Sequence, residues 1–356
     1  MRPDTDGPNP LSRATQCSTF FFRHSGGFYL GANVDFPTKS YAHGFVLAGP
    51  RGAWKEPLRL EGIPSSPWLS KHGSITFTDH GKDYPNAGMN EEGLVLAPMS
   101  LPTTQYPPIG TTPRLQLGQW KQHIIDSYAS VGEVLDHITD VEPVGHSSHF
   151  LIADSNGDCA AIEFLEGRAV CRTSEELEIA AITNHSYADC VEFLASLEED
   201  GSLEGANQSL RNFANIAREL RSEDLQTCAD PIERAFAILD SASMPGLTQR
   251  STVYDISGRR AFFRTQIEGT VACVGMKGLD FSAGASPTMV PLTAGLSGNM
   301  TAEAVLLTRE ANVAAAEAMA RMLLEFVPAD QEVPLLSITF AEMMERIIAY
   351  EREVPL

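Results

Sequence analysis

The chain has 356 residues, of which 43% are hydrophobic and 20% are charged, enough apolar material for a sizeable buried core. Its 26 basic and 46 acidic residues give a formal net charge of −20 at pH 7. Such a field repels phosphate backbones and anionic membrane surfaces, so we expect neither nucleic acid nor a membrane among the partners. The six cysteines include no C-x-x-C pair, which argues against a metal cluster and a disulfide scaffold.

The N-terminal segment differs in character from the rest of the chain. Residues 1–16, MRPDTDGPNPLSRATQ, contain three prolines and no apolar run of the kind found in a secretory signal. No later apolar run reaches the length of a membrane span. We therefore expect a leader at 1–16 that is removed, one folded domain at 17–356, and a cytoplasmic location.

Two kinds of periodicity alternate along residues 17–356. Runs rich in β-forming residues, separated by Gly and Asn turns, predict strands at 17–23, 28–34, 43–49, 73–78, 88–99 (after a turn), 149–154, 160–164, 178–183, 251–256, 260–266 and 270–274. Apolar residues at helical spacing predict helices within 114–138, at 186–200, 208–222 and 232–239, and near 301–327 and 338–351. The first of the two C-terminal helices is expected to begin at a Thr301 cap. Hairpins and helices in separate blocks indicate an α+β fold with four layers, αββα.

Cys17 stands where the regular pattern begins. A lone cysteine is most often a buried and inert core residue. If the Gln16–Cys17 bond is cut, however, Cys17 gains a free α-amine whose pKa is roughly 7.7–8. One residue then carries both a nucleophile and a general base.

Several short blocks in a fixed order resemble the choloylglycine hydrolase family, which includes bile salt hydrolases, penicillin V acylases and acid-ceramidase-like amidases. The blocks span about 250 residues: Cys-Ser-Thr-Phe at 17–20, Gly-Ala-Asn-Val-Asp-Phe at 31–36, Gly-Met-Asn-Glu-Glu-Gly-Leu at 88–94, Thr-Asn-His at 183–185, Ser-Leu-Arg at 209–211, Ser-Thr-Val-Tyr-Asp at 251–255 and Phe-Phe-Arg-Thr at 262–265. The resemblance implies an N-terminal-nucleophile hydrolase fold, with 17–356 as its single catalytic domain.

The resemblance also implies a role for each matched residue. Cys17 is expected to be the nucleophile, released by autoproteolysis, and Asp35 to orient its α-amine. The Asn184 side chain and the Ser100 backbone N–H are expected to hold the oxyanion of the tetrahedral intermediate. Arg211 matches an arginine near the catalytic cysteine, although a solvated helix arginine is an equally simple interpretation.

Two positions depart from the bile salt hydrolase pattern. Ala32 replaces an arginine close to the thiol, and Ser100 replaces an asparagine. Both departures argue against bile salts or penicillin V as the specific substrate. The segment after Asn184 is short for the assembly loop of tetrameric members, so a homo-oligomer remains possible but a tetramer is not expected.

These observations predict an amidase that hydrolyses a linear carbon–nitrogen bond of a small N-acyl substrate through an acyl-enzyme on Cys17, without a metal or other cofactor. Two alternatives stay open: an acyltransferase on the same fold, and an unprocessed homologue that only binds its ligand. A papain-like Cys–His pair using His146, His149 or His185 is disfavoured, because no papain-type signature surrounds any cysteine.

Overall fold

The computed structural model describes residues 17–38, 41–200, 203 and 205–356, and the expected leader at 1–16 lies outside this part of the chain. Its first element is the hairpin predicted from the sequence, formed by β1 (Ser18–His24) and β2 (Gly27–Asp35). Ser25 and Gly26 between them both have positive φ, +46° and +79°. This is the left-handed geometry that two-residue hairpin turns require, and Gly26 adopts it without strain.

Two sheets make up the centre of the described structure. The first contains, in spatial order, β14 (Ala181–Ile182), β1, β2, β15 (Thr248–Asp255), β16 (Arg260–Thr265), β17 (Ala272–Gly275) and β19 (Gly298–Asn299). The second contains β13 (Arg168–Thr173), β12 (Cys159–Leu165), β11 (Ser148–Ala153), β8 (Val95–Ser100), β7 (Pro85–Asn90), β6 (Ser74–Thr78), β3 (Phe45–Gly49), β18 (Thr288–Pro291) and β20 (Val305–Leu306). Two short pairs lie outside these sheets: β4 (Trp54–Lys55) with β5 (Trp68–Leu69), and β9 (Arg114–Gln116) with β10 (Glu142–Val144).

The two sheets pack face to face around the main core. Phe20, Leu30 and Phe263 of the first sheet belong to one buried cluster with Ile75 and Phe77 of the second. The rings of Phe77 and Phe263 meet edge to face across the interface, with their centroids 5.3 Å apart. The alternating apolar residues of both sheets therefore share a single interior.

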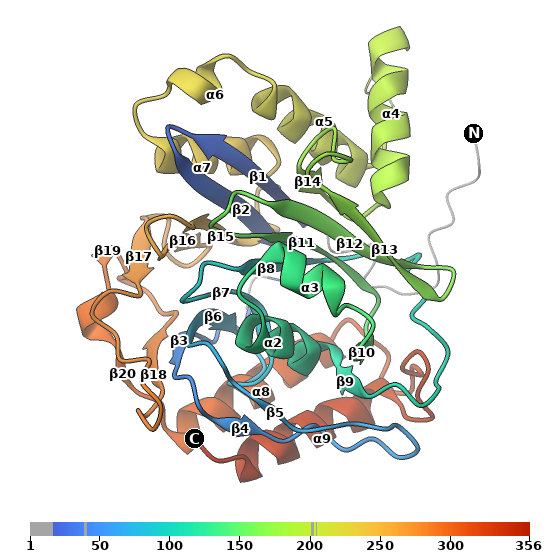
Figure 1. The fold of residues 1–356 in the computed structure, drawn as a ribbon, viewed down its shortest axis with the longest axis vertical. Helices are drawn as coiled ribbons and strands as arrows, with labels where there is room; N and C mark the ends of the chain where they lie inside the picture. Colours follow the sequence, from blue (N-terminus) through green and yellow to red (C-terminus); the bar gives the residue numbers. More distant parts are fainter. Residues whose placement is uncertain (1–16, 39–40, 201–202, 204) are drawn as a thin grey trace.

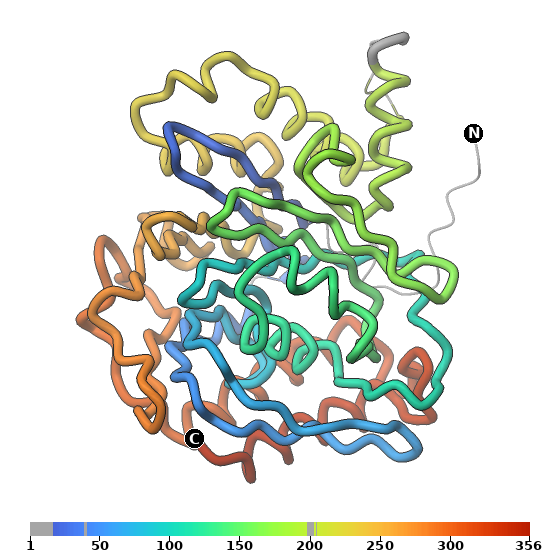
Figure 2. Tube along the Cα trace, in the orientation of Figure 1, coloured from blue at the N-terminus to red at the C-terminus, as the bar shows by residue number. Residues whose placement is uncertain are grey.

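Helices cover the two outer faces (Figure 1). Above the first sheet lie α4 (Tyr187–Asp200), α5 (Gln208–Leu220), α6 (Asp224–Thr227) and α7 (Pro231–Ser241), and on the far side of the second lie α2 (Leu117–Ser127), α3 (Val131–Asp136), α8 (Arg309–Leu324) and α9 (Phe340–Glu353). Figure 2 shows the blue N-terminal hairpin beneath the yellow helices, in the first sheet, and the red C-terminal helices on the far side of the molecule. The predicted α+β, four-layer αββα fold is confirmed.

The beginning of the first C-terminal helix is a correction to the sequence-based expectation. Thr301–Glu303 forms only a 3-10 turn, and β20 follows it. The helix α8 begins at Arg309, where the Thr308 hydroxyl accepts a hydrogen bond from the Ala311 N–H. Thr301 has local cap chemistry, but β20 pairs with β18, and this pairing places the next residues in a sheet.

Smaller differences concern strand boundaries and short elements. Gly88 and Met89 belong to β7, and the turn that precedes β8 occupies the residues after Asn90. The predicted helical segment at 114–138 opens with the short strand β9 before α2 and α3. Within the described residues, no helix is both long and apolar enough to cross a membrane.

Candidate active site

Cys17 lies directly before β1, next to the last residue of β2. The Asp35 backbone N–H donates a hydrogen bond to Cys17 Sγ at 3.4 Å, and the thiol faces the Asp35 carbonyl oxygen at 3.7 Å. The β1–β2 register pairs Ser18 with Asn33, which leaves Cys17 and Asp35 together at the open end of the hairpin. The cysteine side chain is half-buried, whereas Asp35 is completely buried.

The electrostatics of this pair are unusual. Burial raises the pKa of the Cys17 thiol to about 12; the Asp35 charge adds to the rise, and the Arg250 charge opposes it. Burial also raises the pKa of Asp35 to about 7, which the nearby Thr248 hydroxyl partly offsets. Neither Asp35 carboxylate oxygen has a hydrogen-bond partner of good geometry among the described residues. A buried carboxylate in this condition is rare and calls for a missing partner.

The strand β14 carries Asn184 to the same place. It pairs antiparallel with β1, with Thr19 opposite Ile182, so the chain beyond β14 runs toward the Cys17 end of β1 and Asn184 follows two residues later. The Asn184 backbone N–H donates to Ser209 Oγ at 2.8 Å, which ties the end of β14 to the first turn of α5. Its side-chain Nδ2 donates to the Ser100 carbonyl at 2.7 Å, leaving a second N–H on that nitrogen.

Ser100 ends β8 in the opposite sheet, and its backbone N–H is directed away from the neighbouring strand β11. Ser100 stands opposite Ser148, and the next N–H, that of Leu101, donates to the Ser147 carbonyl. This pattern marks Ser100–Ser148 as a non-hydrogen-bonded pair, in which both peptide groups face outward. The Ser100 N–H and C=O therefore both face the side from which Asn184 approaches.

Among the predicted site residues, Arg211 in the first turn of α5 has the least connection to the others. Its Nε donates to the Ala206 carbonyl at 3.0 Å. Cys17, Asp35 and Ser100 line one cavity, of which Arg211 is not a lining residue. A direct role for Arg211 at the thiol stays a prediction.

A buried ion pair that sequence reasoning missed lies beside the thiol. Arg250 of β15 and Asp79, just after β6, are each about 1% exposed, with Nη1 and Oδ1 3.2 Å apart. The Tyr41 hydroxyl donates to the other Asp79 oxygen at 3.0 Å, and the Arg250 guanidinium lies over the Phe77 ring. Arg250 is thus a cation near Cys17 in a protein where Ala32 replaces the usual arginine. Its only sequence signal was a charge next to the predicted strand at 251–256.

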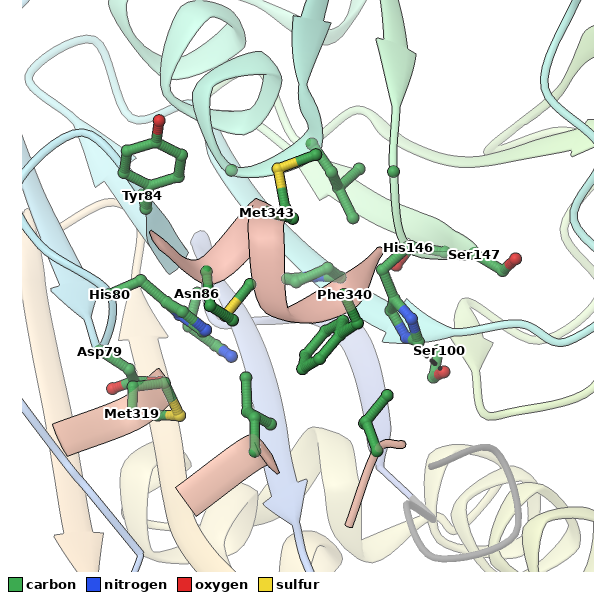
Figure 3. Close-up of a pocket in the computed structure, with 18 of the residues that line it drawn as sticks. Asp79, His80, Tyr84, Asn86, Ser100, His146, Ser147, Met319, Phe340 and Met343 are labelled. Atoms are coloured by element: carbon green, nitrogen blue, oxygen red, sulfur yellow. Dashed lines mark hydrogen bonds between the residues drawn. The ribbon is translucent and has the colours of Figure 1, made fainter. Parts of the chain in front are cut away.

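The cavity that contains Cys17 has a volume of about 260 Å³. Figure 3 shows Ser100 and His146 on one side and His80 with Asn86 on the other, with Phe340 and Met343 of α9 between them. One wall is apolar and comes from the C-terminal helices: Met319, Met322, Phe340, Met343 and Ile347. Among the described residues, no group of three or more His, Cys, Asp or Glu side chains has the arrangement of a metal site.

The three histidines considered from the sequence have other contacts. His149 Nε2 contacts the Thr183 carbonyl at 2.6 Å, and His185 Nδ1 contacts Ser209 Oγ at 3.0 Å, so both support the segment that carries Asn184. His146 Nε2 lies 3.0 Å from Ser100 Oγ, and burial lowers its pKa to about 4. His146 is therefore a neutral neighbour of Ser100 at physiological pH.

Comparison with known proteins shows the family of the chain. A family model described as acyl-coenzyme A:6-aminopenicillanic acid acyl-transferase matches residues 22–243, more than half of the chain. The chain belongs to this family. A curated relative, penicillin V acylase from Pectobacterium atrosepticum, is 22% identical over 301 residues, covering 70% of this chain and 80% of the relative. The resemblance to the choloylglycine hydrolase group is thereby confirmed.

Solved structures support the same fold. Penicillin V acylase from Agrobacterium tumefaciens superposes with a TM-score of 0.70 at 20% identity, over 82% of this chain and 98% of that one. A conjugated bile acid hydrolase from Clostridium perfringens superposes with a TM-score of 0.63 at 16% identity, over 79% and 98%. The family match includes Asp35, Ser100, Asn184 and Arg211, but it starts after Cys17 and ends before α8 and α9.

Proposed function

We propose that this chain is an N-terminal-nucleophile cysteine amidase that hydrolyses the linear amide bond of a small N-acyl substrate. Removal of residues 1–16 creates the active form, with 17–356 as one catalytic domain and Cys17 as its first residue. The relatives named penicillin V acylase and conjugated bile acid hydrolase support a reaction at an amide carbonyl.

The observation that carries this proposal is the unpartnered Asp35 carboxylate beside Cys17. The carboxylate is completely buried, and neither oxygen has a hydrogen-bond partner of good geometry within the described residues, although the Thr248 hydroxyl lies nearby. Cleavage before Cys17 produces an α-ammonium group on the residue whose sulfur already contacts the Asp35 backbone. That cation supplies the hydrogen-bond donors and the opposite charge that the buried carboxylate lacks.

The first half of the reaction uses the amine in its neutral form. The α-amine of Cys17 takes the thiol proton as sulfur bonds to the substrate carbonyl carbon. The high pKa that burial gives the thiol means that this proton leaves during attack, so an adjacent base is needed. The oxyanion accepts hydrogen bonds from the second Asn184 Nδ2–H and the Ser100 N–H.

The second half returns the enzyme to its starting state. As the carbon–nitrogen bond breaks, the α-ammonium gives its proton to the leaving amine, and a thioester remains on Cys17. Water then attacks the thioester carbonyl, and the α-amine accepts a proton from this water. Collapse of the second oxyanion breaks the carbon–sulfur bond and releases the carboxylic acid, while the α-ammonium returns its proton to the departing sulfur and so restores the thiol and the neutral amine.

An acyltransferase is the second candidate, and the family description favours it because it names acyl transfer. In that reaction an amine or a thiol, rather than water, takes the acyl group from the same thioester. Both candidates share Cys17, Asp35, Ser100 and Asn184. They differ only in the acceptor.

A trapping experiment tests the proposal. Purified protein is mixed with penicillin V, quenched in acid within the turnover time, and examined by peptide mass spectrometry. With a compound that is a substrate, we expect the mass of one acyl group, phenoxyacetyl in the case of penicillin V, on the peptide that begins with Cys17, together with the free acid. A further series of N-acylglycines with increasing chain length covers substrates that lack a β-lactam ring.

The same reaction with an added amine separates the two candidates. Free acid as the main product supports the hydrolase, whereas the new amide as the main product identifies a transferase. No adduct and no product with any of these compounds, from protein that retains residues 1–16, would identify the non-catalytic homologue instead.

A further inference from the structure

Lys121 is a buried cation in the wall of the active-site cavity. It lies in the middle of α2, and the residue is 9% exposed. Its Nζ donates to the Asn86 carbonyl of β7 at 3.3 Å, and no described carboxylate lies within ion-pair distance of it. A lysine in this position is unusual, because a buried charge is normally paired.

The other nearly buried lysines among the described residues show the normal arrangement. Lys55 Nζ lies 3.1 Å from both Asp83 and Asp126, and Lys82 Nζ lies 2.9 Å from Asp83. Burial lowers the pKa of Lys121 to about 8, whereas the two carboxylates beside Lys55 raise the pKa of that residue. Lys121 therefore lacks the anion that the fold provides elsewhere.

The other polar groups of the cavity do not neutralise it. Asp79 is engaged with Arg250 and Tyr41, and Asp35 lies at Cys17. Burial and, to a smaller extent, the Lys121 charge lower the pKa of both His80 and His146 to about 4, and the Asp79 charge opposes this shift at His80. Both imidazoles are neutral at pH 7, so Lys121 is the buried cation of the described cavity lining that has no ion pair. The carboxylate of Glu332, which also lines the cavity, belongs to an exposed residue.

Another part of the cavity lining has a different chemistry. Met319 and Met322 of α8 and Phe340, Met343 and Ile347 of α9 give an apolar surface that faces the same space (Figure 3). Both helices lie beyond the residues of the family match, so this wall is set by a separate part of the chain. Methionine side chains adapt to irregular apolar groups, including alkyl chains.

We infer that Lys121 is the binding site for a carboxylate on the substrate, so that the carboxylate and the apolar group of the N-acyl amide occupy different parts of the cavity. This inference rests on the proposed amidase function. The carboxylate completes the Lys121 ion pair, and the apolar group occupies the methionine-rich wall. Within the cavity, the attraction between the Lys121 ammonium and an anionic substrate offsets the repulsion of that substrate by a protein with a net charge of −20.

The carboxylate can belong to either half of the substrate, and two pairs of compounds distinguish these cases. Hexanoylglycine and hexanoylglycinamide differ only in a carboxylate on the amine half. Adipic acid monoanilide and its terminal amide differ only in a carboxylate on the acyl half. For wild-type protein we expect kcat/KM to be about tenfold or more higher for the acid in one pair, mainly through a lower KM.

Three variants connect this preference to Lys121. Lys121→Met keeps most of the side-chain volume and removes the charge, so the acid and its amide should be hydrolysed at similar rates. Lys121→Arg keeps a cation and should retain part of the preference. Lys277→Gln removes an exposed lysine outside the cavity lining and should change nothing. Circular dichroism and thermal melting confirm that each variant is folded.

Two results would overturn the inference: equal kcat/KM for acid and amide in both pairs with wild-type protein, or an acid preference that survives in Lys121→Met. If the wild-type protein hydrolyses none of the four compounds, that result counts against the proposed function with these substrates. In that case calorimetric titration of wild-type and Lys121→Met with the same four ligands decides the inference. Tighter binding of an acid only to the wild type supports it, and equal binding contradicts it.

Discussion

The Asp35 backbone N–H donates to Cys17 Sγ at 3.4 Å, while the carboxylate of Asp35 is completely buried and has no hydrogen-bond partner of good geometry among the described residues. The proposed nucleophile and the proposed orienting group are therefore adjacent before any α-amine exists. This relationship links leader removal to catalysis, because the same event frees the amine and supplies the carboxylate with a partner.

Removing the Asp35 charge should stabilise the leader-bearing protein in a pH-dependent way. In the folded state the pKa of Asp35 is about 7, above its usual value of 3.8, so the folded protein binds this proton more tightly than the unfolded chain. The free energy of unfolding therefore falls as pH rises from about 4 to about 7. In a Cys17→Ala background, Asp35→Asn should add nothing near pH 4 and at most about 4 kcal/mol at pH 7 and above. Urea unfolding measures this, with exposed Asp330→Asn as the control. A pH-independent difference would contradict it.

Asn184→Ala should lower kcat by about a hundredfold or more with little change in KM. The oxyanion develops only in the transition state, so the loss of one donor affects the chemical step and not ground-state binding. Steady-state kinetics on whichever substrate the trapping experiment identifies measures this. Asn156→Ala, in the distant turn between β11 and β12, is the matched control. An unchanged kcat in Asn184→Ala would remove Asn184 from the oxyanion site.

Breaking the buried Arg250–Asp79 pair should destabilise the fold strongly. Arg250→Met leaves the Asp79 charge buried without its cation, which costs roughly 3–5 kcal/mol of unfolding free energy. Adding Asp79→Asn to Arg250→Met should recover part of this loss, because the unpaired charge disappears. Chemical denaturation of both single variants and the double variant gives the coupling. If the single-variant effects simply add, the ion pair contributes nothing.

Met343→Ala should enlarge the apolar part of the cavity and move the preferred acyl chain to greater length. Met343 is 2% exposed and lines the cavity, so its truncation also costs roughly 2–5 kcal/mol of stability. A series of N-acylglycines of increasing chain length measures the optimum. Met276→Ala truncates a buried methionine outside the cavity lining and should lose stability without a shift in chain length. The same optimum in both variants would exclude α9 from acyl binding.

Local signals were sufficient for the hairpins and for most helices. The Cys17–Asp35 hairpin follows from two β-rich runs around Ser25-Gly26-Gly27, and the structure uses this turn. Asn184 is different, because nothing local brings it to Cys17. Its position depends on the pairing of β14 with β1, and only family resemblance pointed to it in the sequence.

Features that depend on contacts between distant parts of the chain could not be predicted from the sequence. Arg250 and Asp79 are 171 positions apart, so their ion pair has no local pattern. Lys121 lies in an amphipathic helix where a solvent-facing lysine is the ordinary expectation, and only the packing of α2 on β7 shows that it is buried. Thr301 resembled a helix cap, but the residues that follow it form β20, which pairs with β18, and not a helix.

The most direct test of the central claim is the intact mass and N-terminal sequence of the purified protein, measured for the wild type and Cys17→Ala. The account predicts that the wild type begins at Cys17, whereas Cys17→Ala retains residues 1–16 because it lacks the nucleophile that removes them. A fully active wild-type protein that still carries residues 1–16 would contradict the account, because no α-amine would then exist at Cys17 to act as the base.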